Sequence, residues 1–314
     1  MLQDRHLVPV RPCLFNGFSC PECGAERPET TGTEWPGIHG GGRYHCAGCG
    51  LDFLRDLPVG FAVDHPMAIG SATGKLYNPT NGPVWVHEPL LKAYHGQDDR
   101  AVQIERVVKK VEKRVIILNT LDFLYGHVLL KLFNAPHYFK AHPGMGLVVL
   151  VPRMYAWLIP DGVAEAWIVD LKLGEMAGWH TAVDRFIQER LTEYDEVYLA
   201  KGYAHPELAG MDMEQFTGVV PFDPAKFTTA PPHVTFVVRE DRLWYRNSLT
   251  KFTHRVIRKL GLGRPFGGLF LADQDRSVAK SMRLLRRDKP GITFSIVGLG
   301  EAKDHAMDVE DLRT

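Results

Sequence analysis

Four of the five cysteines of this 314-residue chain form two C-x-x-C-G pairs, Cys20 with Cys23 and Cys46 with Cys49. Two such pairs allow four thiolates to converge tetrahedrally on Zn²⁺, and the glycine after each pair permits the tight turn that this requires. Because four cysteines close the coordination sphere, we expect a structural site rather than a catalytic one. The alternative is a pair of reduced turns without metal.

The segment between the two pairs, residues 24–45, is rich in Gly, Pro and Thr. It cannot build a core of its own, so a bound metal would have to supply its folding energy. His39 or His45 could replace a thiolate, although four cysteines are the simpler set, and Cys13 is expected to be an ordinary reduced thiol. Residues 1–56 resemble a zinc ribbon, a module that binds nucleic acid, binds protein or braces a neighbouring domain.

A second group with chemical potential lies in the stretch NTLDFLYGH, residues 119–127, which follows the apolar run RVIILN. Histidine titrates near neutral pH and can accept a proton from a substrate, so His127 is a candidate base and Asp122 its candidate orienting partner. The alternative is that His127 caps the helix that starts there or packs against the preceding segment.

The elements that would position these residues follow a regular α/β rhythm. Short apolar runs typical of buried strands alternate with amphipathic segments typical of helices, which predicts a parallel, doubly wound sheet. The predicted strands are residues 114–119, 146–152, 164–171 and 195–200, and the predicted helices are residues 125–135 and 182–194. Ligands of such sheets bind beyond the carboxyl ends of the strands, which points to the loops 119–127, 152–162 and 200–207.

A shorter α/β segment follows the proline-rich stretch 222–233. It contains predicted strands at residues 234–238 and 292–297, a third candidate strand at 267–272, and predicted helices at 248–261 and 274–287. Only 81 residues extend from Val234 to Thr314, fewer than a doubly wound domain usually has. The sequence is therefore a fragment, a shortened relative whose sheet a partner completes, or a different fold.

These patterns divide the chain into four parts: a zinc ribbon at 1–56, a connector at 57–111, a first Rossmann-like domain at 112–225 and a second, short one at 232–314. Within the connector, the run VWVH at residues 84–87 is expected to be extended. Residues 101–111 are expected to form an amphipathic helix that is capped by Asp98 or Asp99. Their apolar positions have helical spacing: Val102, Ile104, Val107, Val108 and Val111.

Two motifs resemble those of GT-B glycosyltransferases. Gly126 and His127 open a helix after the first strand, as in the amino-terminal domain of several members, although Tyr125 stands where the usual second glycine would be. The run VVREDR resembles the strand-end arginine motif of the fucosyltransferase-like branch, although Val237 replaces the histidine upstream of the arginine. The resemblance implies a fold of two Rossmann-like units and a nucleotide-sugar donor.

The same resemblance implies roles for individual residues. His127 would be the base and Asp122 its partner, while Arg239 would bind the donor diphosphate through the guanidinium fork. The other implied donor-binding residues are Arg242, Gly298 and Gly300. GT-B enzymes usually need no catalytic metal, so the resemblance implies none here.

Composition narrows the functional classes. Lys and Arg together equal Asp and Glu at 37 each, so nucleic acid is not the expected partner, although the ribbon leaves that route open. No run reaches the roughly 18 apolar residues of a membrane span, and we expect a cytoplasmic protein.

The expected partners are a nucleotide sugar and an unidentified acceptor. The alternatives are a non-catalytic zinc-ribbon and α/β binding protein, or a methyltransferase, which the lack of a G-x-G turn after RVIILN disfavours.

Overall fold

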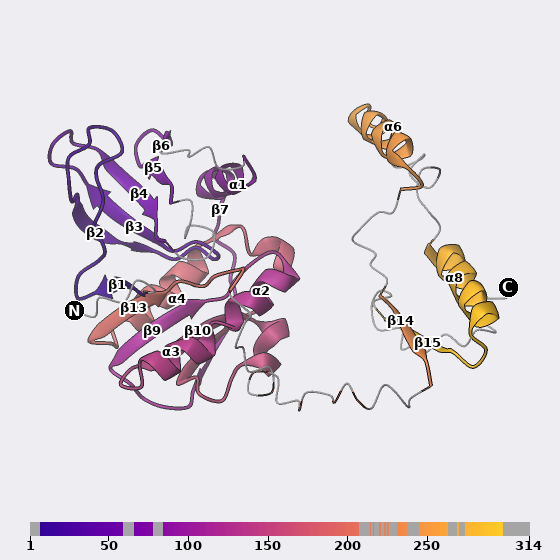
Figure 1. Ribbon diagram of the computed structural model, residues 1–314. Coiled ribbons are helices and arrows are strands. Elements are labelled where there is room, and N and C mark those ends of the chain that lie inside the picture. The colour runs from indigo at the N-terminus through magenta and orange to yellow at the C-terminus, as the bar shows by residue number, and fades with distance from the viewer. Residues whose placement is uncertain are drawn as a thin grey trace. The chain divides into compact units, whose positions relative to one another are not determined.

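The structure is a computed structural model that describes residues 7–58, 66–77, 84–206, 231–237, 245–262 and 274–297, together with positions 214, 216, 220, 223, 225 and 269. The chain divides into two compact units, Met1–Pro221 and Phe222–Thr314, and each is described by itself. The fold is mixed α/β with several sheets, which confirms the predicted class (Figure 1).

A central sheet of six strands organises the described part of the first unit, in the order β1-β13-β9-β10-β11-β8. The four inner strands β13, β9, β10 and β11 are parallel, and the two edge strands pair antiparallel with their neighbours. The strands are β1 (Leu7–Arg11), β8 (Ile104–Val108), β9 (Arg114–Asn119), β10 (Gly146–Pro152), β11 (Glu165–Val169) and β13 (Glu196–Ala200). The four strands predicted from apolar runs are therefore confirmed, each within two residues.

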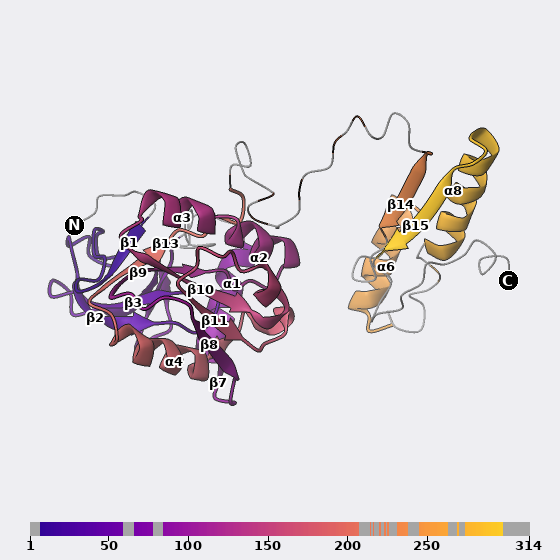
Figure 2. The ribbon, with the colours of Figure 1, turned by 90° about the horizontal axis from the view of Figure 1, so that it is seen from below.

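These inner strands are mostly apolar because helices cover both faces of the sheet. One face packs against α2 (Tyr125–Leu132) and α3 (Ala135–Ala141), and the other against α4 (Thr181–Leu191). Figure 2 shows α3 and α4 on opposite sides of the sheet. Every residue of β10 is buried. A two-sided core of this kind explains why the strands do not alternate between apolar and polar residues.

The direction of the crossovers reverses between β9 and β13. From β9 the chain passes through α2 and α3 to β10 and then β11, while α4 returns it to β13 on the other side of β9. In parallel sheets the carboxyl edge at such a reversal is the usual place for a ligand, because the loops diverge there and leave a crevice. The loop after β9 and the loop after β13 meet at this edge.

The cysteine-containing segment forms a second sheet in the order β2-β3-β4-β5-β6. Its strands are β2 (Glu29–Glu34), β3 (Gly41–His45), β4 (Asp52–Asp56), β5 (Ala68–Gly70) and β6 (Leu76–Tyr77). Trp35, Tyr44 and Phe53 belong to the same buried cluster as residues of β9, β10 and α4. Packing thus continues across the predicted limit at residue 56, and the two sheets share one core.

Two predicted elements of the connector are wrong. Residues 101–111 contain the strand β8 instead of a helix, and β8 pairs antiparallel with β11 from Ile104 to Val108. Isoleucine and valine spaced along the segment suit both structures, and the free edge of β11 decides in favour of the strand. The VWVH run at 84–87 belongs to the helix α1 (Val84–His95) instead of an extended segment. Leu90 and Ala93 of α1 pack in a small cluster with Leu54, Met67, Ile69 and Trp179.

Four further short elements belong to the described part of the first unit. β7 (Gln97–Asp98) pairs parallel with β12 (Trp179–His180). This pairing places the segment after α1 beside the segment before α4. The 3-10 helices η2 (Arg153–Leu158) and η3 (Leu173–Glu175) follow β10 and β11. Both 3-10 helices lie in loops that leave the carboxyl edge of the sheet.

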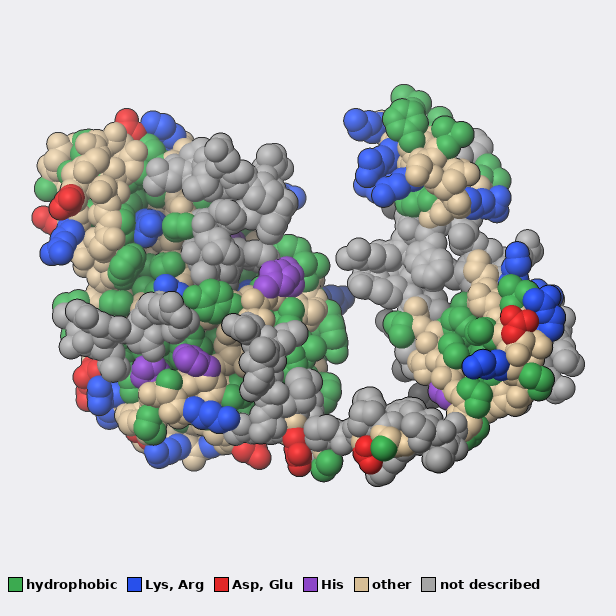
Figure 3. All heavy atoms as spheres, viewed as in Figure 1, with side chains coloured by type: hydrophobic (Ala, Val, Ile, Leu, Met, Phe, Trp, Pro, Cys, Tyr) green, Lys and Arg blue, Asp and Glu red, His purple; other side chains and the backbone are tan. Residues whose placement is uncertain are grey.

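The described part of the second unit contains two strands and two helices, as predicted. β14 (His233–Val237) pairs parallel with β15 (Thr293–Val297), and α8 (Gln274–Asp288) packs on them through Val278 and Met282. α6 (Ser248–Lys259) carries Lys and Arg beside exposed apolar side chains (Figure 3). Five of the six residues of the third candidate strand, 267–272, lie outside the described residues, and the sixth, Leu269, is helical instead of extended. That this unit is Rossmann-like remains a prediction. No helix among the described residues of either unit is long and apolar enough to cross a membrane.

Candidate functional site

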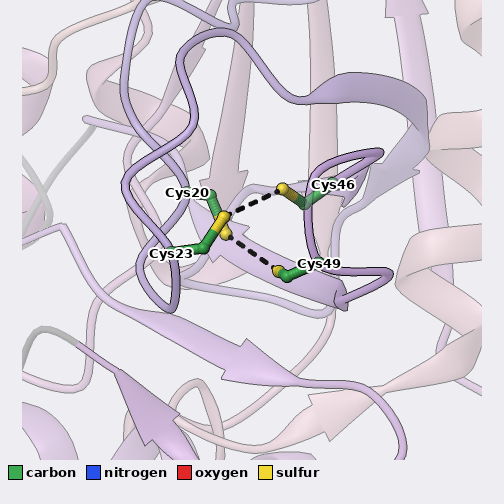
Figure 4. A group of neighbouring side chains, drawn as sticks. All are labelled: Cys20, Cys23, Cys46 and Cys49. Carbon is green, nitrogen blue, oxygen red and sulfur yellow. Dashed lines mark hydrogen bonds between the residues drawn. The ribbon is translucent and has the colours of Figure 1, made fainter.

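The four cysteines of the C-x-x-C-G pairs come together in one cluster, as the spacing predicts. Cys20 and Cys23 precede β2, while Cys46 and Cys49 lie in the turn between β3 and β4. Their ligand atoms all lie within 4.8 Å of one another. Figure 4 shows the sulfur atoms directed at a common centre, with 3.7 Å between those of Cys20 and Cys49 and 3.6 Å between those of Cys23 and Cys46.

Local turns hold each pair in this arrangement. The N–H of Gly24 donates to the carbonyl of Cys20 at 3.0 Å, and the N–H of Gly50 donates to the carbonyl of Cys46 at 2.7 Å. Gly24 and Gly50 have φ of 78° and 73°, in the left-handed region that side chains disfavour. The glycine after each pair is therefore required by the backbone, as the motif predicts.

The cluster fits a tetrahedral metal ion such as zinc. A tetrahedron with Zn–S bonds of about 2.3 Å places its sulfur atoms about 3.8 Å apart, close to the two separations above. His39 and His45 are not part of the cluster, and their Nδ1 atoms pair with Asp56 at 2.9 Å and with Asp52 at 2.7 Å. Cys13 is exposed and separate from the cluster. Four thiolates would complete the coordination sphere, which suits a structural role.

The surroundings of Cys46 favour its thiolate. Burial acts to raise the pKa of this thiol, but hydrogen bonds from the backbone N–H of Cys49, from the Cys20 and Cys23 thiols and from the N–H of Gly48 lower the pKa to about 7. A bound cation would act in the same direction, because a metal ligates the deprotonated form. The pKa of Cys23 and the pKa of Cys49 are raised instead, so this effect does not extend to the whole cluster.

The second candidate site lies where β9 ends. Asp122, three residues beyond β9, has no exposed side-chain surface, and the Nζ of Lys131 lies 2.9 Å from its Oδ2. The other carboxylate oxygen accepts the N–H of Leu124 at 2.9 Å, and Lys131 also donates to the carbonyl of Leu121 at 2.9 Å. A buried carboxylate needs such partners, because an unpaired charge is costly inside a protein. Asp122 is therefore held rigidly against the start of α2.

His127 lies beside this ion pair. Its Nδ1 is 3.5 Å from Oδ2 of Asp122, so the structure brings together the two residues that the sequence pairs. Its side chain is 18% exposed, and its ring packs edge-on against His205 with 5.4 Å between the ring centroids. The histidine is thus neither sealed in the core nor freely solvated.

His127 lines an open pocket of about 1110 Å³ at the carboxyl edge of the sheet. The walls come from α1, from the loop between β9 and α2, from the segment around η3 and from the loop after β13. The lining residues are Pro89, Lys92, Ala93, Gly96, Phe123, Leu124, His127, Gly174, Ala177, Gly178 and His205. Two of the three loops expected at this edge, 119–127 and 200–207, contribute to the lining. The third, 152–162, contributes no lining residue among those described.

Sequence reasoning missed Lys131, Lys92 and His205. Lys131 could have been found from the sequence. It lies within the apolar stretch VLLKLF, one helical turn after His127, and a lysine buried there needs a carboxylate partner. His205 lies in a loop that was predicted to face the site, but nothing in its spacing marks it. Lys92 could not be found, because it reaches the pocket through the helix α1 that the sequence did not predict.

The residues assigned to donor binding lie outside the described residues. Arg239 and Arg242 fall in the segment 238–244, and Gly298 and Gly300 fall in the segment 298–314. Their roles remain predictions from the resemblance.

Comparison with known proteins brings no further constraint on this site. No family model matches the chain, and neither a curated protein nor a solved structure shows a significant match to it. The chemistry of the described residues and the resemblance of the motifs are therefore what a functional proposal can draw on.

Proposed function

We propose that this protein is a glycosyltransferase that moves a sugar from a nucleotide-sugar donor to a hydroxyl acceptor, with His127 as general base. The observation that carries the proposal is the His127–Asp122–Lys131 group beside a pocket at the carboxyl edge of parallel strands. A histidine backed by an anchored carboxylate, at the edge of the sheet where ligands bind, suits proton abstraction.

The transfer step has a simple atom balance. The acceptor oxygen forms a bond to the anomeric carbon of the donor sugar, and the bond from that carbon to the phosphate oxygen breaks. The nucleoside diphosphate leaves with the electron pair of the broken bond. The proton of the acceptor hydroxyl goes to Nε2 of His127, because Nδ1 lies toward Asp122. The carboxylate favours the imidazolium that results.

The proposal includes a fold of two Rossmann-like units. The parallel order β13-β9-β10-β11, with its reversal between β9 and β13, supports this for the first unit. Donor binding by Arg239, Arg242, Gly298 and Gly300 belongs to the proposal through the resemblance alone. Zinc at the cysteine cluster would act as a structural ion, since four thiolates leave it no position for a substrate.

The test measures release of nucleoside diphosphate from UDP-glucose, UDP-N-acetylglucosamine, GDP-mannose and GDP-fucose, with and without a mixture of sugars and alcohols as acceptors. We expect one donor to react. The variant His127→Gln should then lose about 10²-fold or more of the rate, the usual scale of general base assistance, with a melting temperature within a few degrees of the parent.

His137→Gln is the matched control, because His137 is an exposed histidine of α3 that does not line the pocket. It should react at the parent rate. If the His127→Gln variant reacts at the parent rate, His127 is not the general base. If nucleotide sugars bind without reacting, the alternative of a non-catalytic zinc-ribbon and α/β binding protein replaces it.

A further inference from the structure

The pocket beside His127 has an uneven charge. Its lining includes one ammonium group, Lys92, and two imidazoles, His127 and His205, but no carboxylate among the described residues. Lys92 and His205 make no ion pair or side-chain hydrogen bond with another described residue. Both side chains are exposed. Among the described lining residues, the one side chain with a permanent charge is therefore the cation Lys92, and no carboxylate opposes it.

The carboxylate of Asp122, beside His127, does not offset this charge. Asp122 is fully buried, and Lys131 neutralises it at 2.9 Å. The negative charge of Asp122 is thus already balanced beneath the pocket surface, and the ammonium of Lys92 sets the charge that a ligand meets. An anion would gain charge-assisted hydrogen bonds here that a neutral ligand would not.

The rest of the lining is mostly apolar. Pro89 and Ala93 of α1 form part of one wall, and Phe123 and Leu124 of the loop after β9 form part of another. The volume of about 1110 Å³ is at the upper end of pockets that hold small organic molecules. A ligand suited to this lining has an anionic group at one end and an apolar body.

We infer that this pocket binds a phosphate ester with an apolar body, and that Lys92 and His205 hold the phosphate. A phosphate offers three outer oxygens to such donors, and a carboxylate offers two. This inference rests on the proposed function in one respect: the phosphate ester would be the acceptor, and its free hydroxyl would face His127. Phosphate binding itself does not depend on any transfer.

The test uses phenyl phosphate, which has no hydroxyl to accept a sugar, in isothermal titration calorimetry with no donor present. Phenol is the neutral comparison, benzoate the carboxylate comparison and inorganic phosphate the comparison without an apolar body. We expect phenyl phosphate to bind about tenfold or more tightly than each of the three, in keeping with loss of a charged hydrogen bond or of apolar contact. Equal affinity for benzoate, phenol or inorganic phosphate would overturn the assignment of ligand class.

Two substitutions test the residues. Lys92→Met and His205→Gln should each weaken phenyl phosphate binding by about tenfold or more. The matched controls Lys140→Met and His137→Gln alter exposed side chains of α3 outside the pocket and should keep the parent affinity. If the first pair behaves like the controls, Lys92 and His205 do not hold the anion.

A steric variant tests the location. Gly174 lines the pocket, a Cβ added there meets no atom within 4 Å, and its φ is outside the left-handed region, so Gly174→Phe can place a ring without backbone strain. Gly144 is the control. A Cβ added there also meets no atom within 4 Å and its φ is also outside the left-handed region, but it lies in the loop before β10, at the opposite edge of the sheet. Gly174→Phe should abolish phenyl phosphate binding and Gly144→Phe should preserve it. Binding to both would place the ligand elsewhere.

Failure of this inference can be distinguished from failure of the proposed function. Phenyl phosphate has no hydroxyl to accept a sugar, so its binding to the parent protein is measured without any transfer step. Phosphate binding without transfer by the parent protein would reject the glycosyltransferase and keep the phosphate site. Sugar transfer without phosphate binding would keep the glycosyltransferase and reject the phosphate site.

Discussion

Asp122 is the residue on which the candidate active site depends, and its partners show why. Oδ2 lies 2.9 Å from Lys131 and 3.5 Å from His127, while Oδ1 accepts a backbone N–H. With Lys131 1% exposed, the pair is a buried ion pair in which each charge depends on the other. Lys131 therefore acts as a positioning residue for the carboxylate that faces His127.

Lys131→Met should destabilise the first unit by about 3–5 kcal/mol, because it leaves the buried Asp122 carboxylate without its counter-charge. The loss is measured as a shift of the urea midpoint at constant slope. Lys140→Met, an exposed lysine of α3, should shift it by less than about 0.5 kcal/mol.

The double variant Asp122→Asn with Lys131→Met should regain most of this stability, because both charges are then absent. A double variant as unstable as Lys131→Met alone would show that packing of the lysine stem, and not its charge, is what the site needs.

The segment that forms β8 was predicted to be a helix, and its pairing with β11 explains why it is a strand. Glu165 of β11 is buried and accepts hydrogen bonds from Arg106 of β8 at 2.6 and 3.1 Å, from Trp167 at 2.6 Å and from Tyr194 at 3.0 Å. The hydrogen bonds to Glu165 raise the pKa of Arg106, and burial followed by the Glu165 charge raises the pKa of Tyr194. Both groups therefore remain protonated donors.

Glu165→Gln should cost about 3 kcal/mol in unfolding free energy, because the amide offers one acceptor to four donors and leaves Arg106 with less compensation. Glu196→Gln is the matched control. Glu196 also lies on a parallel strand and pairs with an arginine of the neighbouring strand, Arg114 at 3.1 Å, but both side chains are partly exposed. Its loss should stay below about 1 kcal/mol in the same urea titration. Equal losses would contradict the buried network as the anchor of β8.

At the scale of the whole first unit, the cysteine cluster and the central sheet share one core. Cys20 and Cys46 are buried in the same cluster as Ile117 of β9 and Ile187 of α4. Asn119, at the end of β9, donates to the carbonyl of Gly37 at 2.8 Å. The cysteine cluster therefore belongs to the same core as the face of the sheet that α4 covers.

Purified protein should contain about one zinc ion per chain, bound by the four clustered cysteines. Its removal by a chelator should lower the stability of the first unit, sheet included, by about 4 kcal/mol when free zinc had exceeded its dissociation constant a thousandfold. Acidification should release zinc as well, because protons compete for the thiolates that ligate it, so affinity falls as pH falls. Elemental analysis and thermal unfolding measure the two effects.

Cys49→Ser should lose the zinc and Cys13→Ser should keep it, since Cys13 lies apart from the cluster. Unchanged unfolding of the central sheet after complete removal of the metal would show that the shared core is stable without it.

The amino-acid sequence by itself determined the features whose causes are local. The C-x-x-C-G pairs specify tight turns through glycines with positive φ, and continuous apolar runs specify strands that are covered on both faces. Asp122 and His127 are close in sequence, so a strand end followed by a helix start brings them together. These features were predictable because each depends on residues within one or two turns of chain.

Tertiary structure decided the features that depend on distant partners. Residues 101–111 are compatible with helix or strand, and pairing with β11 makes them a strand. Lys92 and His205 are 113 positions apart and meet at one pocket only because α1 covers the edge of the sheet where β13 ends. The cysteine segment shares its core with α4 for the same reason. Burial of apolar surface rewards such contacts whatever their separation along the chain, so no local pattern encodes them.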